Sequence, residues 1–124
     1  MEILDEYLAA LDAGSAERSV ACFAPGGEVV SPLYGTVPAA RFYPTLFADS
    51  APSRTTLQRL YVDPDDPREV ALAFRYDWVL RDGTPAPFDV VDLITLTHDR
   101  SRIARLVICY DTAPLASAWS RARH

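Results

Sequence analysis

The chain has 124 residues, of which 49% are hydrophobic and 23% charged, a composition typical of one ordinary globular domain. Its net charge of −5 argues against binding to nucleic acid or to an anionic membrane, because those surfaces attract clustered positive charge. All 12 basic residues are arginines, which excludes chemistry that needs a lysine amine, such as Schiff-base catalysis, pyridoxal catalysis and P-loop phosphate binding.

The sequence also bears on location and on metals. The N-terminal stretch MEILDEYLAA is acidic, and no apolar run approaches the roughly 20 residues of a membrane helix, so we expect a cytoplasmic protein. Cys22 and Cys109 lie in apolar segments, which favours two buried thiols over a disulfide. His98 and His124 stand apart, and the acidic loop from Asp63 lacks the glutamate of a calcium loop. We expect neither a metal nor a cofactor.

Two helices are predicted at the start of the chain. The first spans residues 3–13, where apolar side chains recur at a spacing of three or four: Leu4, Tyr7, Leu8 and Leu11. Gly14 ends it, and Ser15 can cap a second helix. We expect Val20 and Phe23 to face inward from this second helix, and the following "APGG" to end it.

A short strand and a third helix follow. Residues 28–31 form an expected strand, and Pro38 suits the first turn of a helix over residues 38–48. Pro44 lies inside that helix and has no N–H for the helical hydrogen bond, so it should kink or split the helix.

The rest of the chain is predicted to be mainly sheet. Residues 54–62 form a weaker strand candidate, and residues 70–80 alternate strictly between large apolar and other side chains. "RDGTP" turns the chain into a strand within residues 87–97, and "HDRSR" turns it into a last strand over residues 102–111. Leu115 and Trp119, four residues apart, indicate a short terminal helix.

Helices come first and hairpin-linked strands follow, an order typical of an α+β domain with helices on one side of an antiparallel sheet. Long strands with one apolar face curl around such helices and leave a hollow, which is a natural pocket for a small apolar ligand. The strand at 87–97 is apolar on its other face too, with Val91, Leu93 and Thr95. A second copy of the chain would cover that face, so we expect a homodimer.

One acidic side chain interrupts the inner face of the strand at 87–97. Alternation places Asp92 on the same face as four apolar residues, Phe88, Val90, Ile94 and Leu96. Burial raises the pKa of a carboxyl group, which then persists as a neutral acid able to donate a hydrogen bond. The alternative is a carboxylate that reaches water or pairs with an arginine such as Arg59 or Arg105.

Three stretches resemble a known family: "EYLAALDAGSAERSVACFAPGGEVVSPLYG", "GTVPAARFY" and "VVDLITLTHDRSRIARLVICYD". They are similar, in order and almost end to end, to the ketosteroid isomerases and SnoaL-like polyketide cyclases of the nuclear-transport-factor-2-like superfamily. The resemblance implies a single domain over residues 1–124. It also implies a cone-shaped, curved, mostly antiparallel sheet wrapped around about three N-terminal helices, an apolar pocket and a dimer.

The resemblance assigns roles to individual residues. Tyr7 matches the isomerases' tyrosine that donates a hydrogen bond to the substrate oxygen, and Asp92 matches their protonated partner acid. Tyr43 matches a further tyrosine that supports the first. Ser31 stands where the isomerases carry the aspartate that removes the proton, and a serine hydroxyl alone is no general base near neutral pH. This departure favours a cyclase or dehydratase over a steroid isomerase.

Asp111 is the remaining candidate for a base. It follows the pocket-facing Tyr110, and many SnoaL-like sequences resemble this one in having "YD" there. Alternatively, Asp111 caps a helix that begins near Pro114. Ser31 and Tyr43 are expected to contact the ligand, and apolar and aromatic residues are expected to complete the pocket, although they would fill an ordinary core equally well: Phe74, Tyr76, Trp78, Ile94, Leu106, Ile108 and Tyr110.

Two kinds of function remain open. The first is a cofactor-independent enzyme acting on an apolar carbonyl compound, such as a polyketide- or steroid-like ring, with Tyr7 and neutral Asp92 holding an enolate oxygen. The second is a ligand-binding or assembly protein that keeps the cavity and the dimer without catalysis. An epoxide-opening enzyme is disfavoured, because the related epoxide hydrolases have an arginine where Val90 stands.

Overall fold

The computed structural model describes residues 2–111 and residue 119. Its helices are α1 (Glu2–Ala13), α2 (Ala16–Ala21) and α3 (Ala39–Ala48). The strands that separate and follow them are β1 (Phe23–Ser31), β2 (Gly35–Pro38), β3 (Ser50–Val62), β4 (Glu69–Leu80), β5 (Phe88–Leu96) and β6 (Ile103–Cys109).

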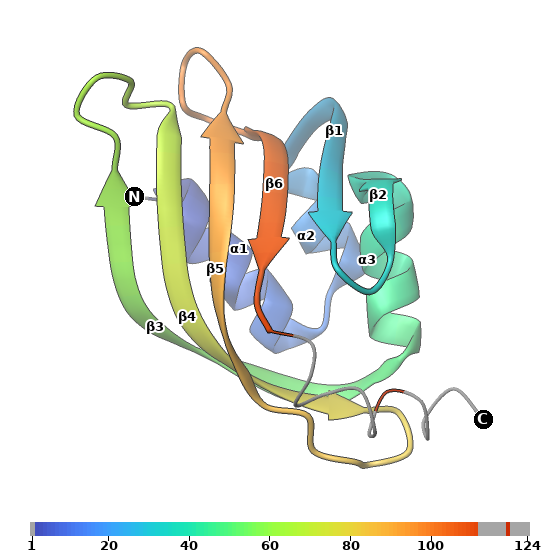
Figure 1. The fold of residues 1–124 in the computed structure, drawn as a ribbon. Helices are drawn as coiled ribbons and strands as arrows, with labels where there is room; N and C mark the ends of the chain where they lie inside the picture. The colour runs from blue at the N-terminus through green and yellow to red at the C-terminus, as the bar shows by residue number, and fades with distance from the viewer. Residues whose placement is uncertain (1, 112–118, 120–124) are drawn as a thin grey trace.

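The strands form one six-stranded sheet in the order β2-β1-β6-β5-β4-β3. Every neighbouring pair is antiparallel except β1 and β6, which run parallel. The long strands curve around α1 while α3 lies beside β1 and β2, so the helices occupy the concave side of the sheet (Figure 1). This arrangement confirms the α+β fold expected from the order of the elements.

The core fills the space between the sheet and the helices. Every second residue of β4 from Val70 to Leu80 is buried, as the strict alternation of the sequence predicts. Helical spacing supplies the opposing surface, with Leu4, Tyr7 and Leu11 buried on α1 and Phe42, Tyr43 and Leu46 buried on α3.

The second helix is shorter than predicted. It ends at Ala21, and Phe23 is buried as the first residue of β1 rather than as part of a helix. The "APGG" segment lies within β1, where the pairing with β6 shifts register between Phe23 and Glu28. Gly27 allows this irregularity, because a Cβ there would lie 2.9 Å from the Phe23 ring.

The third helix is not split. Residues Ala39–Ala48 form one helix with Pro44 inside it, and Pro38 is its N-cap instead of its first turn. Buried residues on both sides of the proline, Tyr43 and Leu46, hold the two halves against the core and thereby offset the lost hydrogen bond.

Among the described residues, no helix is both long enough and apolar enough to cross a membrane.

The predicted strands are present with altered ends. β3 begins at Ser50, four residues before its predicted start, and β6 ends at Cys109. Cys22 is buried as expected, but Cys109 is exposed, because it pairs with Val91 on the face turned away from the helices. The predicted terminal helix lies outside the described residues except for Trp119.

Candidate ligand-binding cavity

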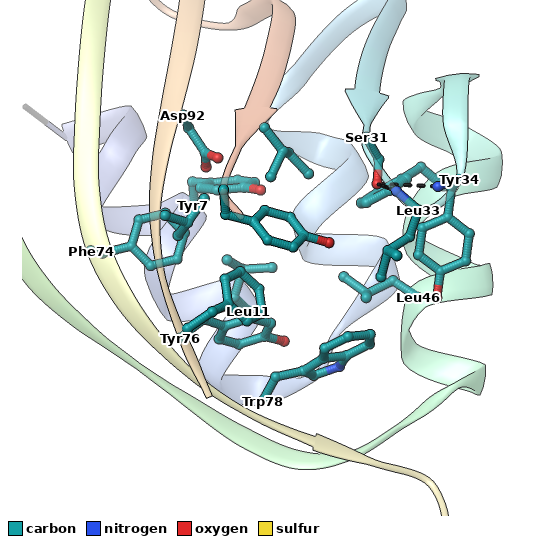
Figure 2. A pocket seen from close by; sticks show the side chains of 15 residues that line it. Tyr7, Leu11, Ser31, Leu33, Tyr34, Leu46, Phe74, Tyr76, Trp78 and Asp92 are labelled. Carbon is teal, nitrogen blue, oxygen red and sulfur yellow. Dashed lines mark hydrogen bonds between the residues drawn. The ribbon is translucent and has the colours of Figure 1, made fainter. Parts of the chain in front are cut away.

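A cavity lies between the concave face of the sheet and the helices α1 and α3. About 470 Å³ of empty space lies within its outline, and part of this space is open to solvent. Eight residues proposed from the sequence line it: Tyr7, Ser31, Phe74, Tyr76, Trp78, Asp92, Ile108 and Tyr110. Most of the wall is aromatic or aliphatic, so the cavity suits an apolar ligand, as Figure 2 shows.

Asp92 is the acidic residue of this wall. It lies in the middle of β5, paired with Leu72 of β4 and Ile108 of β6, and only 2% of its surface is exposed. Its Oδ1 atom is buried and has no hydrogen-bond partner among the described residues. Burial raises the pKa of this carboxyl group well above its ordinary value and thereby favours its protonated form. Arg105 pairs with Glu28 instead.

Two buried tyrosines stand beside this acid. The hydroxyl oxygens of Tyr7 on α1 and Tyr43 on α3 are 2.8 Å apart and form a hydrogen bond. Burial raises the pKa of Tyr7 well above its usual value, and the nearby Tyr43 and Asp92 raise it further. Burial likewise raises the pKa of Tyr43. Both phenols therefore keep their protons at neutral pH and can act as hydrogen-bond donors.

Ser31 closes the cavity at the end of β1. Its Oγ accepts hydrogen bonds from the backbone N–H groups of Leu33 (3.2 Å) and Tyr34 (3.3 Å), drawn as dashed lines in Figure 2. This local pattern is the one by which serine side chains stabilise tight turns, here the turn between β1 and β2. Ser31 is thus held in the cavity wall by the turn, with its hydroxyl partly occupied.

The family model described as a SnoaL-like domain matches residues 4–106. The chain belongs to the SnoaL-like family. This confirms the resemblance seen in the sequence. The matched segment includes nearly all of the helices and strands, and the only cavity residues that lie beyond it are Ile108 and Tyr110 among the described residues. No curated protein matches the chain in sequence.

Solved structures share the fold of this SnoaL-like domain at low sequence identity. One is a hypothetical protein with a ketosteroid isomerase-like fold from Catenulispora acidiphila, in complex with trimethylamine (16% identity, TM-score 0.80, covering 94% of this chain and 90% of that one). Another is the epoxide hydrolase/cyclase-like enzyme SalBIII, which has a role in pyran ring formation in the polyether salinomycin (16% identity, TM-score 0.77, covering 91% of this chain and 91% of that one). A third is TerC co-crystallised with polyporic acid (18% identity, TM-score 0.74, covering 98% of this chain and 95% of that one).

Four residues proposed from the sequence do not line the cavity of the SnoaL-like domain. Tyr43 lies behind Tyr7 and reaches the cavity only through that side chain. Ile94 and Leu106 pair with each other across β5 and β6 and are buried in the core. They form the next pair on the same face of the sheet after Asp92 and Ile108. Asp111 follows β6 and is exposed, and unlike its neighbour Tyr110 it does not line the cavity.

Several wall residues were not proposed from the sequence: Leu11, Leu33, Tyr34, Phe42, Leu46, Phe88 and Val90. Phe88 and Val90 carried a usable signal, because they share the strand face of Asp92. Leu33 and Tyr34 lie in the turn after Ser31, which no periodicity could assign to the cavity.

Among the described residues, no group of three histidine, cysteine or acidic side chains could hold a metal ion.

Proposed function

We propose that this SnoaL-like protein is a cofactor-independent enzyme that binds an apolar carbonyl compound and stabilises its enol or enolate. The reaction would be a cyclisation, dehydration or isomerisation of a polyketide- or steroid-like ring. One observation carries the proposal: the Asp92 carboxyl group is buried in the wall of an apolar cavity, and its Oδ1 has no hydrogen-bond partner in the part of the chain that the structure describes. A ligand oxygen would supply the missing partner.

The two donors would act together on one oxygen. Asp92 and Tyr7 line the same cavity and are close enough for the carboxyl group to affect the pKa of the phenol. When Tyr43 donates to Tyr7, the Tyr7 proton is left for the ligand. Donors fixed in an apolar site stabilise developing negative charge more strongly than water does, since the local dielectric is low.

The proton removed from carbon needs a different acceptor from that of the isomerases. Ser31 occupies the position of their aspartate, and its hydroxyl is engaged by the following turn. A bound water or a basic atom of the substrate itself would take the proton, or Asp111 if the end of β6 moved. A substrate with an already acidic methylene would need the least help, which favours cyclisation or dehydration.

The second candidate is a binding protein with the same cavity and no catalytic activity. The engaged Ser31 hydroxyl supports it, because Asp92 is the only carboxyl group among the described residues of the wall. The structural neighbours include both an enzyme, SalBIII, and a hypothetical protein in complex with trimethylamine. The two candidates differ in proton exchange and share the oxygen site.

Titration with 2-naphthol, whose phenolate resembles an enolate, tests the oxygen site. We expect Tyr7→Phe and Asp92→Leu each to weaken binding by about 3- to 10-fold, the effect of one neutral hydrogen bond. Tyr110→Phe is the matched control, since Tyr110 lines the same cavity. Equal affinities in all four proteins would refute the oxygen site.

Deuterium exchange then separates the enzyme from the binder. The α-protons of 2-tetralone, an apolar ketone with an acidic methylene, should exchange faster with wild-type protein than with Asp92→Leu. Exchange at the buffer rate in both proteins, with naphthol binding intact, would favour the binding protein.

We also propose that two copies of the chain associate through the outer face of the sheet. Exposed apolar side chains lie there on β3 and β5, on either side of β4, and include Tyr61, Val91 and Leu93. The register places Tyr61, Ala71, Leu93 and Val107 in one row across four strands. Sedimentation should give a dimer for the wild type and a monomer for Leu93→Arg, and a wild-type monomer at high concentration would contradict the proposal.

A further inference from the structure

A second pocket lies on the far side of two side chains that also line the main cavity, Leu11 and Tyr76. It is formed by the last turn of α1 with Gly14, by Phe47 of α3 and by the beginning of β3. Its wall is more polar than that of the main cavity and includes Asp12, Ser50 and Ser53. Leu11 and Tyr76 thus separate an apolar space from a partly polar one.

An irregularity in β3 opens this pocket. Pro52 has no N–H for the sheet, and the register between β3 and β4 shifts between Ala51 and Arg54. Ser53 stabilises the irregular segment, because its Oγ accepts from the Val79 N–H and donates to the Ala51 carbonyl, both at 2.9 Å. The pocket wall is therefore built by local hydrogen bonds.

The Tyr76 hydroxyl is the unpaired group at this wall. Tyr76 is 5% exposed, and its buried oxygen has no hydrogen-bond partner among the described residues. Burial raises the pKa of the Tyr76 hydroxyl well above its usual value; the nearby Ser53 hydroxyl opposes this shift and Asp12 adds to it. The Ser53 and Tyr76 hydroxyls do not reach hydrogen-bond geometry. Both neighbours belong to the second pocket, so the hydroxyl lies at the boundary with that pocket.

Asp12 supplies the complementary acceptor. Its Oδ1 accepts from the Thr55 N–H at 2.6 Å and from the Thr55 hydroxyl at 2.9 Å, which fixes the carboxylate beside the pocket. Its Oδ2 has no partner among the described residues. A donor and a free carboxylate oxygen therefore border the same space.

We propose that the second pocket binds a neutral hydroxyl group of a small ligand, which accepts a hydrogen bond from Tyr76 and donates one to Asp12. An ammonium group could not accept from the phenol, and a carboxylate or phosphate would be repelled by Asp12. A hydroxyl group meets both requirements at once. The proposal is independent of any enolate chemistry in the main cavity.

Three probes of similar shape test this selectivity: cyclohexanol, cyclohexylamine and cyclohexanecarboxylate, each titrated at pH 7 into ¹⁵N-labelled protein. Cyclohexanol should shift the amide signals of Gly14 and Ser53, and it should bind at least fivefold more tightly than the other two. Tyr76→Phe should weaken cyclohexanol binding at least fivefold. Asp92→Leu, which changes only the main cavity, should leave these shifts unchanged.

A second variant keeps the test decisive if Tyr76→Phe alters packing. Asp12→Asn removes the negative charge but retains an acceptor for Thr55, so cyclohexanecarboxylate should bind at least fivefold more tightly than it does to wild type. The proposal is overturned if Tyr76→Phe binds cyclohexanol as wild type does, if cyclohexylamine binds more tightly than cyclohexanol, or if cyclohexanol shifts only signals of the main cavity.

Discussion

The Tyr7 and Tyr43 hydroxyls, 36 residues apart in the sequence, share a buried hydrogen bond of 2.8 Å that joins α1 to α3. The two rings are nearly perpendicular, with centroids 6.0 Å apart. Their contact fixes the phenol of Tyr7, which faces the cavity, from the side of the core. The geometry of the candidate oxygen site thus depends on a residue, Tyr43, that does not itself line the cavity.

Removing the supporting phenol should destabilise the fold and weaken the site. Tyr43→Phe should lower the free energy of unfolding by about 0.5–1.5 kcal/mol, measured by urea denaturation, because the buried Tyr7 hydroxyl loses its partner. In the double variant Tyr7→Phe/Tyr43→Phe neither hydroxyl of this pair is left without its partner, so the loss should be smaller than the sum of the single losses. Additive losses would mean that the two hydroxyls do not interact.

Asp92 should make stability depend on pH. Its pKa is raised in the folded protein, so the folded state holds the proton more tightly than the unfolded chain, whose aspartates titrate near about pH 4. The contribution of Asp92 is therefore fully present below that pH and is lost as the pH rises toward the folded pKa.

Asp92→Asn removes this titration. Relative to the variant, the wild type should lose stability as the pH rises above about 4 toward the folded pKa of Asp92, by up to about 1.4 kcal/mol per pH unit. Urea denaturation across that range measures the difference. Asp65→Asn, at an exposed position, is the control, and its free energy of unfolding should change with pH in the same way as that of the wild type. The same result for Asp92→Asn would mean that Asp92 is ionised and hydrated in the folded protein.

Ser31→Asp should supply the missing base. An aspartate at this position can accept the Leu33 and Tyr34 N–H groups as the serine does, while its second oxygen faces the cavity. General bases contribute about 10²–10⁴-fold to proton transfer, so deuterium exchange into 2-tetralone should rise by about 10²-fold or more. Ser31→Asn has the same size without the basicity, and an equal rise with it would exclude this explanation.

Gly27→Ala tests the irregularity in β1. The new Cβ would lie 2.9 Å from the Phe23 ring and 3.0 Å from the Ala24 carbonyl oxygen. Such overpacking should lower the free energy of unfolding by about 1–3 kcal/mol in thermal or urea denaturation. Phe23→Leu should recover part of the loss in the double variant, and no recovery would place the strain in the backbone contact.

Alternation and helical spacing predicted the strands, the helical stripes and the buried position of Asp92, because those features depend on local periodicity. The end of α2 was missed, since Phe23 fits an inward helical position as well as the start of a buried strand. Pro44 misled for a different reason: tertiary packing of Tyr43 and Leu46 outweighs the local preference of the proline. Periodicity assigns a residue to a face but not to a depth, so Ile94 and Leu106 were assigned to the cavity although they belong to the core.

The single parallel junction of the sheet has a consequence for how the chain folds. Glu28 of β1 and Arg105 of β6 are joined by an ion pair across 77 residues, and without β6 the β1–β2 hairpin has no neighbour in the sheet. Contacts of such long range close late and slow folding, because a large loop must be ordered first. During synthesis, the wall that holds Ser31 would meet the wall that holds Asp92 only after the last strand leaves the ribosome.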